Sequence, residues 1–264
     1  MRIPIHQVDA FTHTVFGGNP AAVCCLPRWL GDDLLRSIAA ENNLSETAFL
    51  VPDRDPVPLR WFAPAGEVPL CGHATLAAGF VALNHLFPER SSVAFDSPAG
   101  VLTVSREGSE LAVRLPAVRT SVLGEPPIAL GKGLPVEPTE VLVSRADPNY
   151  LVIVETADQV RSVRPDLQAL ESLHPYGVAI SAPGGAVDFV SRYFAPGYGI
   201  PEDPVTGSIH CALGPYWAGR LGKGSLRARQ LSARGGELGV RVEDDGVLLT
   251  GGAVRYLDGE IHLG

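Results

Sequence analysis

The stretch Trp61-Phe62-Ala63-Pro64, followed by Cys71-Gly72-His73, decides how this chain is organised, because it occurs in the sequence twice. The second copy reads Tyr193-Phe194-Ala195-Pro196 and continues to Thr206-Gly207-Ser208, with a connector three residues longer. A single match of four residues arises easily by chance. The sequence on either side of each copy therefore has to be compared as well.

The similarity extends in both directions from these two stretches. Upstream, Asn19-Pro20-Ala21-Ala22-Val23 corresponds to Asn149-Tyr150-Leu151-Val152-Ile153, and downstream residues 97–104 correspond to residues 232–240. Matches that recur in the same order indicate a duplicated structural unit. We therefore expect two homologous halves, 1–120 and 121–264, with the join in the adjoining Pro- and Gly-rich stretch 124–138, which shows no helical or alternating period.

The first half is expected to consist mostly of short strands. Alternating or β-branched runs bounded by Pro and Gly predict strands at 2–9, 19–26, 44–51, 57–63, 92–96, 100–105 and 110–115. An amphipathic helix is expected at 32–41, and a helix at 73–86 is apolar on nearly every face. A helix of that kind must be wrapped on all sides, so the sequence predicts an α+β fold with a sheet curled around it.

The corresponding helix of the second half is expected at 207–220. It contains Pro215, which lacks a backbone N–H and should kink or stop the helix there.

Composition excludes several classes of protein. The chain has 21 basic and 29 acidic residues, a formal net charge of −8, so nucleic acid and anionic membranes are not expected partners. The four cysteines lack metal or disulfide spacing, and the N-terminus lacks a leader pattern, which favours a reduced, cytoplasmic compartment. No phosphate-binding loop, dinucleotide fingerprint or zinc motif is present, so we expect neither a cofactor nor a metal.

Each half begins its buried helix with a small-residue turn. Gly72 opens the first, and Gly207 with Ser208 opens the second. Unpaired backbone N–H groups and the helix dipole at such a position favour an anion. The sequence therefore predicts a small carboxylate as substrate, held in a cleft between the two halves.

Three residues are candidates for proton transfer. Alternation places Glu46 on the same strand face as Leu44 and Ala48, where poor solvation should raise the pKa of its carboxyl; a solvent-exposed or arginine-paired glutamate is the alternative. His73 follows the glycine turn with a reference pKa suited to proton transfer, although it could simply cap its helix. Asp203 precedes Pro204, which equally fits a helix cap.

Cys71 is a further candidate. A thiol at a helix N-terminus has a lowered pKa and can act as a base or nucleophile. Its counterpart in the second half is Thr206, so a racemase with one thiol on each side of the substrate carbon cannot be built from this pair.

Several runs of this sequence closely resemble those of the PhzF family of phenazine-biosynthesis-like proteins. The likeness covers nearly the whole chain and is carried by Val8-Asp9-Ala10-Phe11, Gly18-Asn19-Pro20-Ala21-Ala22-Val23, Asn43-Leu44-Ser45-Glu46-Thr47-Ala48-Phe49, Cys71-Gly72-His73-Ala74-Thr75, Asp203-Pro204-Val205-Thr206-Gly207-Ser208 and Gln230-Leu231-Ser232-Ala233-Arg234-Gly235-Gly236.

The resemblance implies a diaminopimelate-epimerase-like fold, a homodimer, and cofactor-free isomerisation of trans-2,3-dihydro-3-hydroxyanthranilate. Carried over by motif, Glu46 would be the general acid/base, and His73 and Asp203 would orient it or share the proton. Gly72, Gly207, Ser208 and the neighbouring Cys71 would contact the substrate carboxylate.

Two other functions stay open at this point. One is an amino-acid epimerase or dehydratase that uses Cys71 as a base. The other is a non-catalytic interaction protein that has kept the fold.

Overall fold

The computed structural model describes residues 1–264 and divides the chain into two compact units. The first comprises residues 1–115 and 250–264, and the second comprises residues 116–249. The halves expected at 1–120 and 121–264 differ from these units because the last strand of the chain belongs to the first unit. No helix is long and apolar enough to span a membrane.

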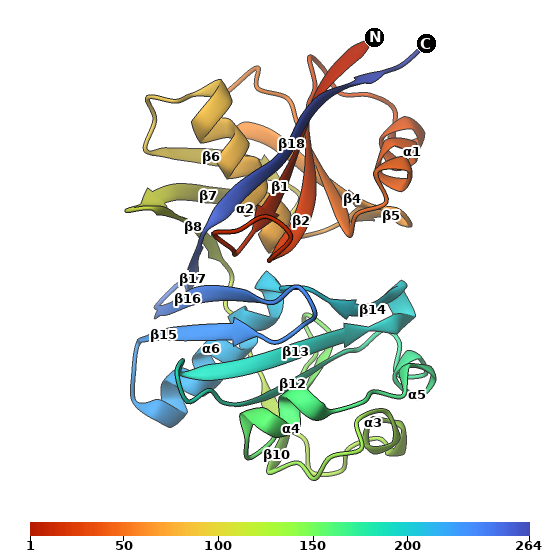
Figure 1. Cartoon of the computed structure of the whole chain (residues 1–264), viewed down its shortest axis with the longest axis vertical. Helices are drawn as coiled ribbons and strands as arrows, with labels where there is room; N and C mark the ends of the chain where they lie inside the picture. Colours follow the sequence, from red (N-terminus) through yellow and green to blue (C-terminus); the bar gives the residue numbers. More distant parts are fainter. The chain divides into compact units, whose positions relative to one another are not determined.

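The first unit is a strongly curved sheet in which eight strands pair in the order β8–β7–β6–β4–β3–β2–β1–β18, with β5 added to β4 (Figure 1). The seven strands predicted in this region are confirmed, with ends that shift by at most two residues. Their bounds are β1 Arg2–Ala10, β2 Asn19–Cys25, β3 Glu46–Leu50, β4 Val57–Ala63, β5 Gly66–Val68, β6 Ser92–Ser97, β7 Gly100–Glu107, β8 Glu110–Leu115 and β18 Ala253–His262.

The second unit repeats the same pairing order. β10 is antiparallel to β11, β11 parallel to β12, β12 antiparallel to β13, and β13 parallel to β15, as β1, β2, β3, β4 and β6 pair in the first unit. The two units thus share one topology, as the repeated motifs predict. The strands are β9 Ser121–Val122, β10 Glu140–Ser144, β11 Asn149–Ile153, β12 Gly177–Pro183, β13 Phe189–Ala195, β14 Ile200–Asp203, β15 Ser225–Gln230, β16 Gly236–Glu243 and β17 Gly246–Gly251.

In each unit an additional strand pairs with the first strand of the repeat. β9, which follows β8 in the chain, pairs with β10, and β18, which follows β17, pairs with β1. This explains why the unit boundaries cross the sequence repeat.

The central helix of the first unit is α2 (Gly72–Val81), which continues as a π-helical turn, η1 (Ala82–Leu86). Every residue of α2 except Phe80 is buried, and the helix contacts β1, β2, β3, β7 and β8. The apolar sequence at 73–86 therefore does form a helix wrapped by a sheet, and only its last turn departs from α geometry.

The second central helix is α6 (Gly207–Leu221), and it continues past Pro215, where the sequence predicts a kink or a stop. A proline removes the hydrogen bond that its N–H would donate to the carbonyl four residues earlier, here that of Cys211. That carbonyl instead accepts a hydrogen bond from the backbone N–H of Val118 at 3.0 Å. Because the orphaned acceptor finds another donor, the helix continues for six residues beyond the proline.

The remaining helices lie outside the sheets. α1 (Asp32–Asn42) confirms the amphipathic helix at 32–41 and buries Leu35 and Ile38, while Leu34 stays exposed. α4 (Ala157–Ser162) and α5 (Leu167–Glu171) follow β11. The stretch 124–138, expected to be a structureless join, instead contains α3 (Ile128–Gly133), because its leucines are buried in the core of the second unit.

Candidate active site

Glu46 begins β3, opposite Ala21 of the neighbouring parallel strand β2. Its side chain is 13 % exposed, and its Oε2 lies 3.4 Å from Nε2 of His73. A carboxylate this far from bulk water loses much of its hydration. The environment is the one expected from the strand alternation.

His73 lies in the first turn of α2 and is buried. Its Nδ1 is 3.2 Å from Nδ2 of Asn19 and 3.5 Å from Sγ of Cys71. Asn19 begins β2, and its Oδ1 accepts a hydrogen bond from the hydroxyl of Ser45 at 3.2 Å. Strand β2, the loop before β3 and the start of α2 thus converge on one imidazole.

These contacts determine which nitrogen of His73 carries the proton. Because the Asn19 carbonyl accepts from Ser45, its amide –NH₂ faces Nδ1, which must then act as the acceptor. The proton is assigned to Nε2, the nitrogen beside the Glu46 carboxylate. No hydrogen bond to Nε2 is formed with good geometry, so this N–H is buried and available to Glu46 or to a ligand.

Burial lowers the pKa of His73 from 6.5 to about 3. The expectation that this imidazole titrates near neutrality is therefore wrong, because desolvation disfavours its charged form. His73 is therefore a neutral hydrogen-bond donor at physiological pH.

The depressed pKa of His73 predicts a pH dependence of stability. The unfolded chain binds a proton on His73 as the pH falls below 6.5, whereas the folded chain binds it only near pH 3. The contribution of the neutral imidazole to the unfolding free energy is therefore fully present above pH 6.5 and is lost progressively at lower pH. We expect His73→Gln to have a shallower fall in unfolding free energy between pH 6.5 and pH 4 than the wild type. Urea titrations across this range measure it, and parallel curves for the two proteins would contradict it.

Cys71 is the N-cap residue of α2 and is buried. Its backbone carbonyl accepts hydrogen bonds from the N–H and the hydroxyl of Thr75 at 3.1 and 2.5 Å. Gly72 follows it as the first residue of the helix. The predicted grouping of Glu46, Cys71, Gly72 and His73 is therefore present within the first unit.

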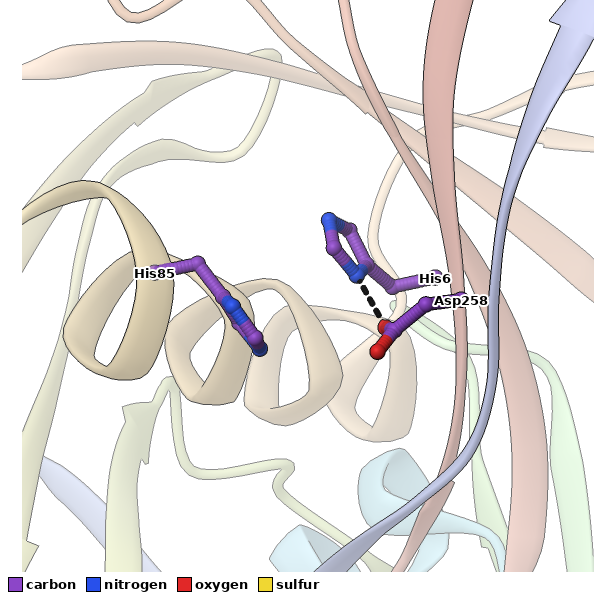
Figure 2. Close-up of side chains that lie close together, drawn as sticks. All are labelled: His6, His85 and Asp258. Atoms are coloured by element: carbon purple, nitrogen blue, oxygen red, sulfur yellow. Dashed lines mark hydrogen bonds and ion pairs between the residues drawn. The ribbon is translucent and has the colours of Figure 1, made fainter.

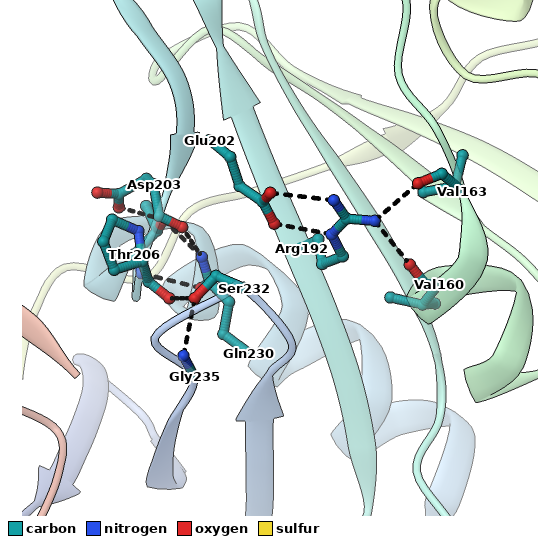
Figure 3. Close-up of polar contacts among 10 residues, drawn as sticks. Val160, Val163, Arg192, Glu202, Asp203, Thr206, Gln230, Ser232 and Gly235 are labelled. Carbon is teal, nitrogen blue, oxygen red and sulfur yellow. Dashed lines mark hydrogen bonds and ion pairs between the residues drawn. The ribbon is translucent and has the colours of Figure 1, made fainter. Parts of the chain in front are cut away.

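Asp203 lies at the end of β14 in the second unit and is buried. Its Oδ2 accepts a hydrogen bond from the hydroxyl of Thr206 at 2.5 Å (Figure 3). Gly207 and Ser208 then open α6, as Gly72 and His73 open α2. The predicted residues Asp203, Gly207 and Ser208 therefore lie near one another in the second unit. Thr206, which lies between them in sequence, donates a hydrogen bond to Asp203.

Gln230 is a residue of this second group that sequence reasoning missed. It is fully buried at the end of β15, where its –NH₂ donates to the carbonyl of Asp203 at 2.8 Å and its Oε1 accepts from the N–H of Thr206 at 2.9 Å (Figure 3). One amide side chain therefore fixes both the loop before α6 and its cap. Its sequence signals are that it follows the run Ser225–Arg229 and that it opens residues 230–236, one of the runs that carry the family resemblance, but neither indicates these contacts.

Asn19 and Ser45 were missed for a similar reason. Both stand in the motifs that carry the family resemblance, yet nothing in residue type distinguishes a turn asparagine from one that orients an imidazole. Their role follows only from the contact with His73.

Glu46, Cys71 and His73 also offer donor atoms that could bind a metal ion together. One ligand atom from each of Glu46, Cys71 and His73 lies within 4.8 Å of the others, and thiolate, imidazole and carboxylate are the ligands that Zn²⁺ takes in proteins. The sequence predicts no metal. Whether the reaction needs one is tested by the assay described below.

The family model for phenazine biosynthesis-like protein (PhzC-PhzF) matches residues 8–259. A Pseudomonas aeruginosa protein described as an uncharacterized isomerase is 47% identical over 263 residues, covering 100% of both chains. The human phenazine biosynthesis-like domain-containing protein is 37% identical over 298 residues, covering 99% of each.

Solved structures agree in fold. The crystal structure of a PhzF family protein from Enterococcus faecalis superposes with a TM-score of 0.94 at 39% identity, covering 100% of both chains. A probable proline racemase from Agrobacterium radiobacter superposes with a TM-score of 0.67 at 13% identity, covering 99% of this chain and 93% of the other, which shows a shared fold alone. The duplicated α+β architecture is that of diaminopimelate-epimerase-like proteins, and the chain belongs to the phenazine biosynthesis-like (PhzF) protein family.

Proposed function

We propose that this protein is an isomerase that moves a proton within a small cyclic carboxylate, without a cofactor and with Glu46 as the general acid/base. Relatives described as isomerases support an isomerase-type enzyme. The observation that carries the finer proposal is the placement of the Glu46 carboxylate beside the neutral Nε2–H of a buried His73.

The pair suits a base that must also return its proton. The Glu46 side chain is 13 % exposed, which keeps bulk water largely away from a proton that it carries. The His73 N–H can donate to the carboxylate while Glu46 is ionised and can turn to the substrate when Glu46 is protonated. His73 is thus proposed to steady the carboxylate without changing its own charge.

The internal repeat supports a single base. Trp61 and Tyr193 are equivalent in the repeat and pair with Ala48 and Ala179, so the position in β12 that corresponds to Glu46 in β3 is Gly177. A Cβ atom at Gly177 would lie 2.0 Å from the hydroxyl oxygen of Tyr193, so no longer side chain fits there. The second unit therefore offers no carboxylate at this position.

The second candidate pair is asymmetric as well. Cys71 corresponds to Thr206, whose hydroxyl already donates its proton to Asp203. A reaction that needs one thiol base from each half is thus disfavoured. A proton removed and returned by one carboxylate agrees better with these residues.

The proposed reaction begins with Glu46 removing the proton from C3 of trans-2,3-dihydro-3-hydroxyanthranilate. The same carboxyl returns the proton elsewhere on the conjugated system, and the resulting enol becomes a ketone. Backbone N–H groups near Gly72, at the start of α2, are proposed to bind the substrate carboxylate, and Gly207 with Ser208 are the proposed anion-binding residues of the second unit. Asp203 is the proposed second proton-handling residue.

The test is proton NMR of the purified protein with this compound in D₂O containing EDTA. Loss of the C3 proton signal and appearance of the ketone would support the reaction class and its independence from metal. If the compound is unchanged while EDTA-free protein acts on it, the reaction requires a metal and the proposal of cofactor independence is wrong. If neither preparation acts, the substrate is wrong.

An epimerase or dehydratase that uses Cys71 is a second candidate, favoured by the 3.5 Å separation of Sγ from His73 Nδ1. If Glu46 is the base, Cys71→Ser should keep its turnover within a small factor of the wild type. If the thiolate is the base, the loss should reach about 10²-fold or more. Initial rates of the two proteins, measured at equal concentration and pH, distinguish these outcomes.

A further inference from the structure

Three side chains from distant parts of the sequence meet on the first unit, away from Glu46 and His73. His6 comes from β1, His85 from the π-helical turn η1, and Asp258 from β18 (Figure 2). One ligand atom from each lies within 4.8 Å of the others. The side chains of His85 and Asp258 are solvent-accessible, so an ion can reach them.

The backbone holds two of these groups together. His6 and Asp258 are directly opposite each other in the antiparallel β1–β18 pair, a position at which side chains on one face are close neighbours. Their Nδ1 and Oδ1 atoms are 2.6 Å apart. The third group is also positioned, because the ring of His85 stacks on that of His6 with centroids 4.7 Å apart and planes inclined by 25°.

The place is already occupied by a cation of the protein itself. Arg255 lies with Nη1 3.0 Å from Oδ2 of Asp258 and 3.4 Å from Nε2 of His85. Since a guanidinium can only donate hydrogen bonds, Nε2 of His85 must present its lone pair. A metal ion also binds an imidazole nitrogen through its lone pair.

We propose that His6, His85 and Asp258 form a binding site for a divalent transition-metal ion, with Zn²⁺ as the best fit. Two imidazoles and one carboxylate are typical ligands of Zn²⁺, whereas Mg²⁺ and Ca²⁺ prefer oxygen alone. Water completes the coordination. The ion replaces the contact of Arg255 with the carboxylate and the hydrogen bond between His6 and Asp258.

Such an ion would link β18 to β1 and to η1. Asp258 is near the C-terminus, His6 near the N-terminus, and His85 at the end of the central helix. A ligand that binds only the folded state raises stability by mass action, and here it would join β18, β1 and η1. The proposal is independent of the reaction at Glu46.

The test is isothermal titration of untagged protein with ZnCl₂, together with the absorption spectrum of bound Co²⁺. We expect one ion per chain, bound at least about tenfold more weakly by His6→Ala, His85→Ala and Asp258→Asn. The matched control is His262→Ala, which removes another β18 histidine beside a carboxylate and should leave the affinity unchanged. Arg255→Ser removes the competing guanidinium and should tighten binding several-fold.

Three outcomes would overturn the proposal. The first is binding that persists in all three ligand variants, each shown to be folded by circular dichroism. The second is binding lost in Cys71→Ser but kept in His85→Ala, which would assign the ion to the Glu46, Cys71 and His73 group instead. The third is weakened binding in Arg255→Ser, because Arg255 would then be part of the site rather than its competitor.

Discussion

Glu46→Gln should lower turnover by about 10²- to 10⁴-fold, the range supplied by one general acid/base. Glutamine keeps the shape of the side chain but cannot accept the C3 proton. Its amide can still lie beside Nε2 of His73, so the fold around β3 and α2 should not change. Proton NMR in D₂O, followed over time for both proteins, measures the isomerisation and the exchange of the C3 proton separately.

The control for this experiment is Glu41→Gln, which removes the charge of an exposed glutamate on the preceding helix. Its turnover should equal that of the wild type. If Glu46→Gln keeps full activity, the general acid/base is another group. If neither Glu46→Gln nor the wild type acts and aromatic carboxylates give no thermal shift, the non-catalytic alternative gains support.

Gly79→Ala should destabilise the first unit by about 1–3 kcal/mol, the usual cost of overpacking a core. Gly79 is buried in the middle of α2, where a Cβ atom would lie 2.3 Å from Cγ1 and 2.6 Å from Cβ of Val104 on β7. The whole valine would have to move, and not only the end of a flexible chain. This exceeds the gain of at most about 1 kcal/mol that alanine gives over glycine in a helix.

The matched control is Gly219→Ala in α6, an exposed helical glycine with no atom within 4 Å of the added Cβ. There the helix preference acts alone, so stability should rise slightly. Urea denaturation measures both variants. The Gly79→Ala/Val104→Ala double variant should lose less than the sum of its parts, and strict additivity would show that the two residues do not collide.

The same close approach occurs in the second unit. A Cβ at Gly214 of α6 would lie 2.5 Å from Cγ1 of Val240 on β16, the counterparts of Gly79 and Val104. A small residue at the centre of each helix lets the sheet wrap tightly around it. The apolar composition of 73–86 predicts burial, but the need for glycine at one position appears only when the facing strand is known.

The family, the fold class and the positions of most strands of the first unit could be predicted from the sequence. Strands at 57–63 and 110–115 were placed correctly because alternation and flanking Pro and Gly report which face of a short segment is buried. Glu46, Cys71 and His73 were each named as site residues from their motifs, and they lie close together after folding.

What the sequence could not predict depends on partners far away in the chain. Pro215 is tolerated because Val118, almost 100 residues earlier, donates to the carbonyl that it orphans. His73 is neutral because of the packing that surrounds it, not because of its neighbours in sequence. His6 and Asp258 are 252 residues apart and become direct neighbours through the pairing of the first and last strands.

The sequence by itself therefore determined the repeat, most strands of the first unit and the residue types available for proton transfer. These follow from local periodicity and local motifs, which report burial and chain direction one segment at a time. Tertiary structure alone decided the protonation state of His73, the roles of Asn19 and Gln230, and the unit to which the last strand belongs. Each of these depends on which groups meet after folding, and periodicity carries no information about the identity of a distant partner.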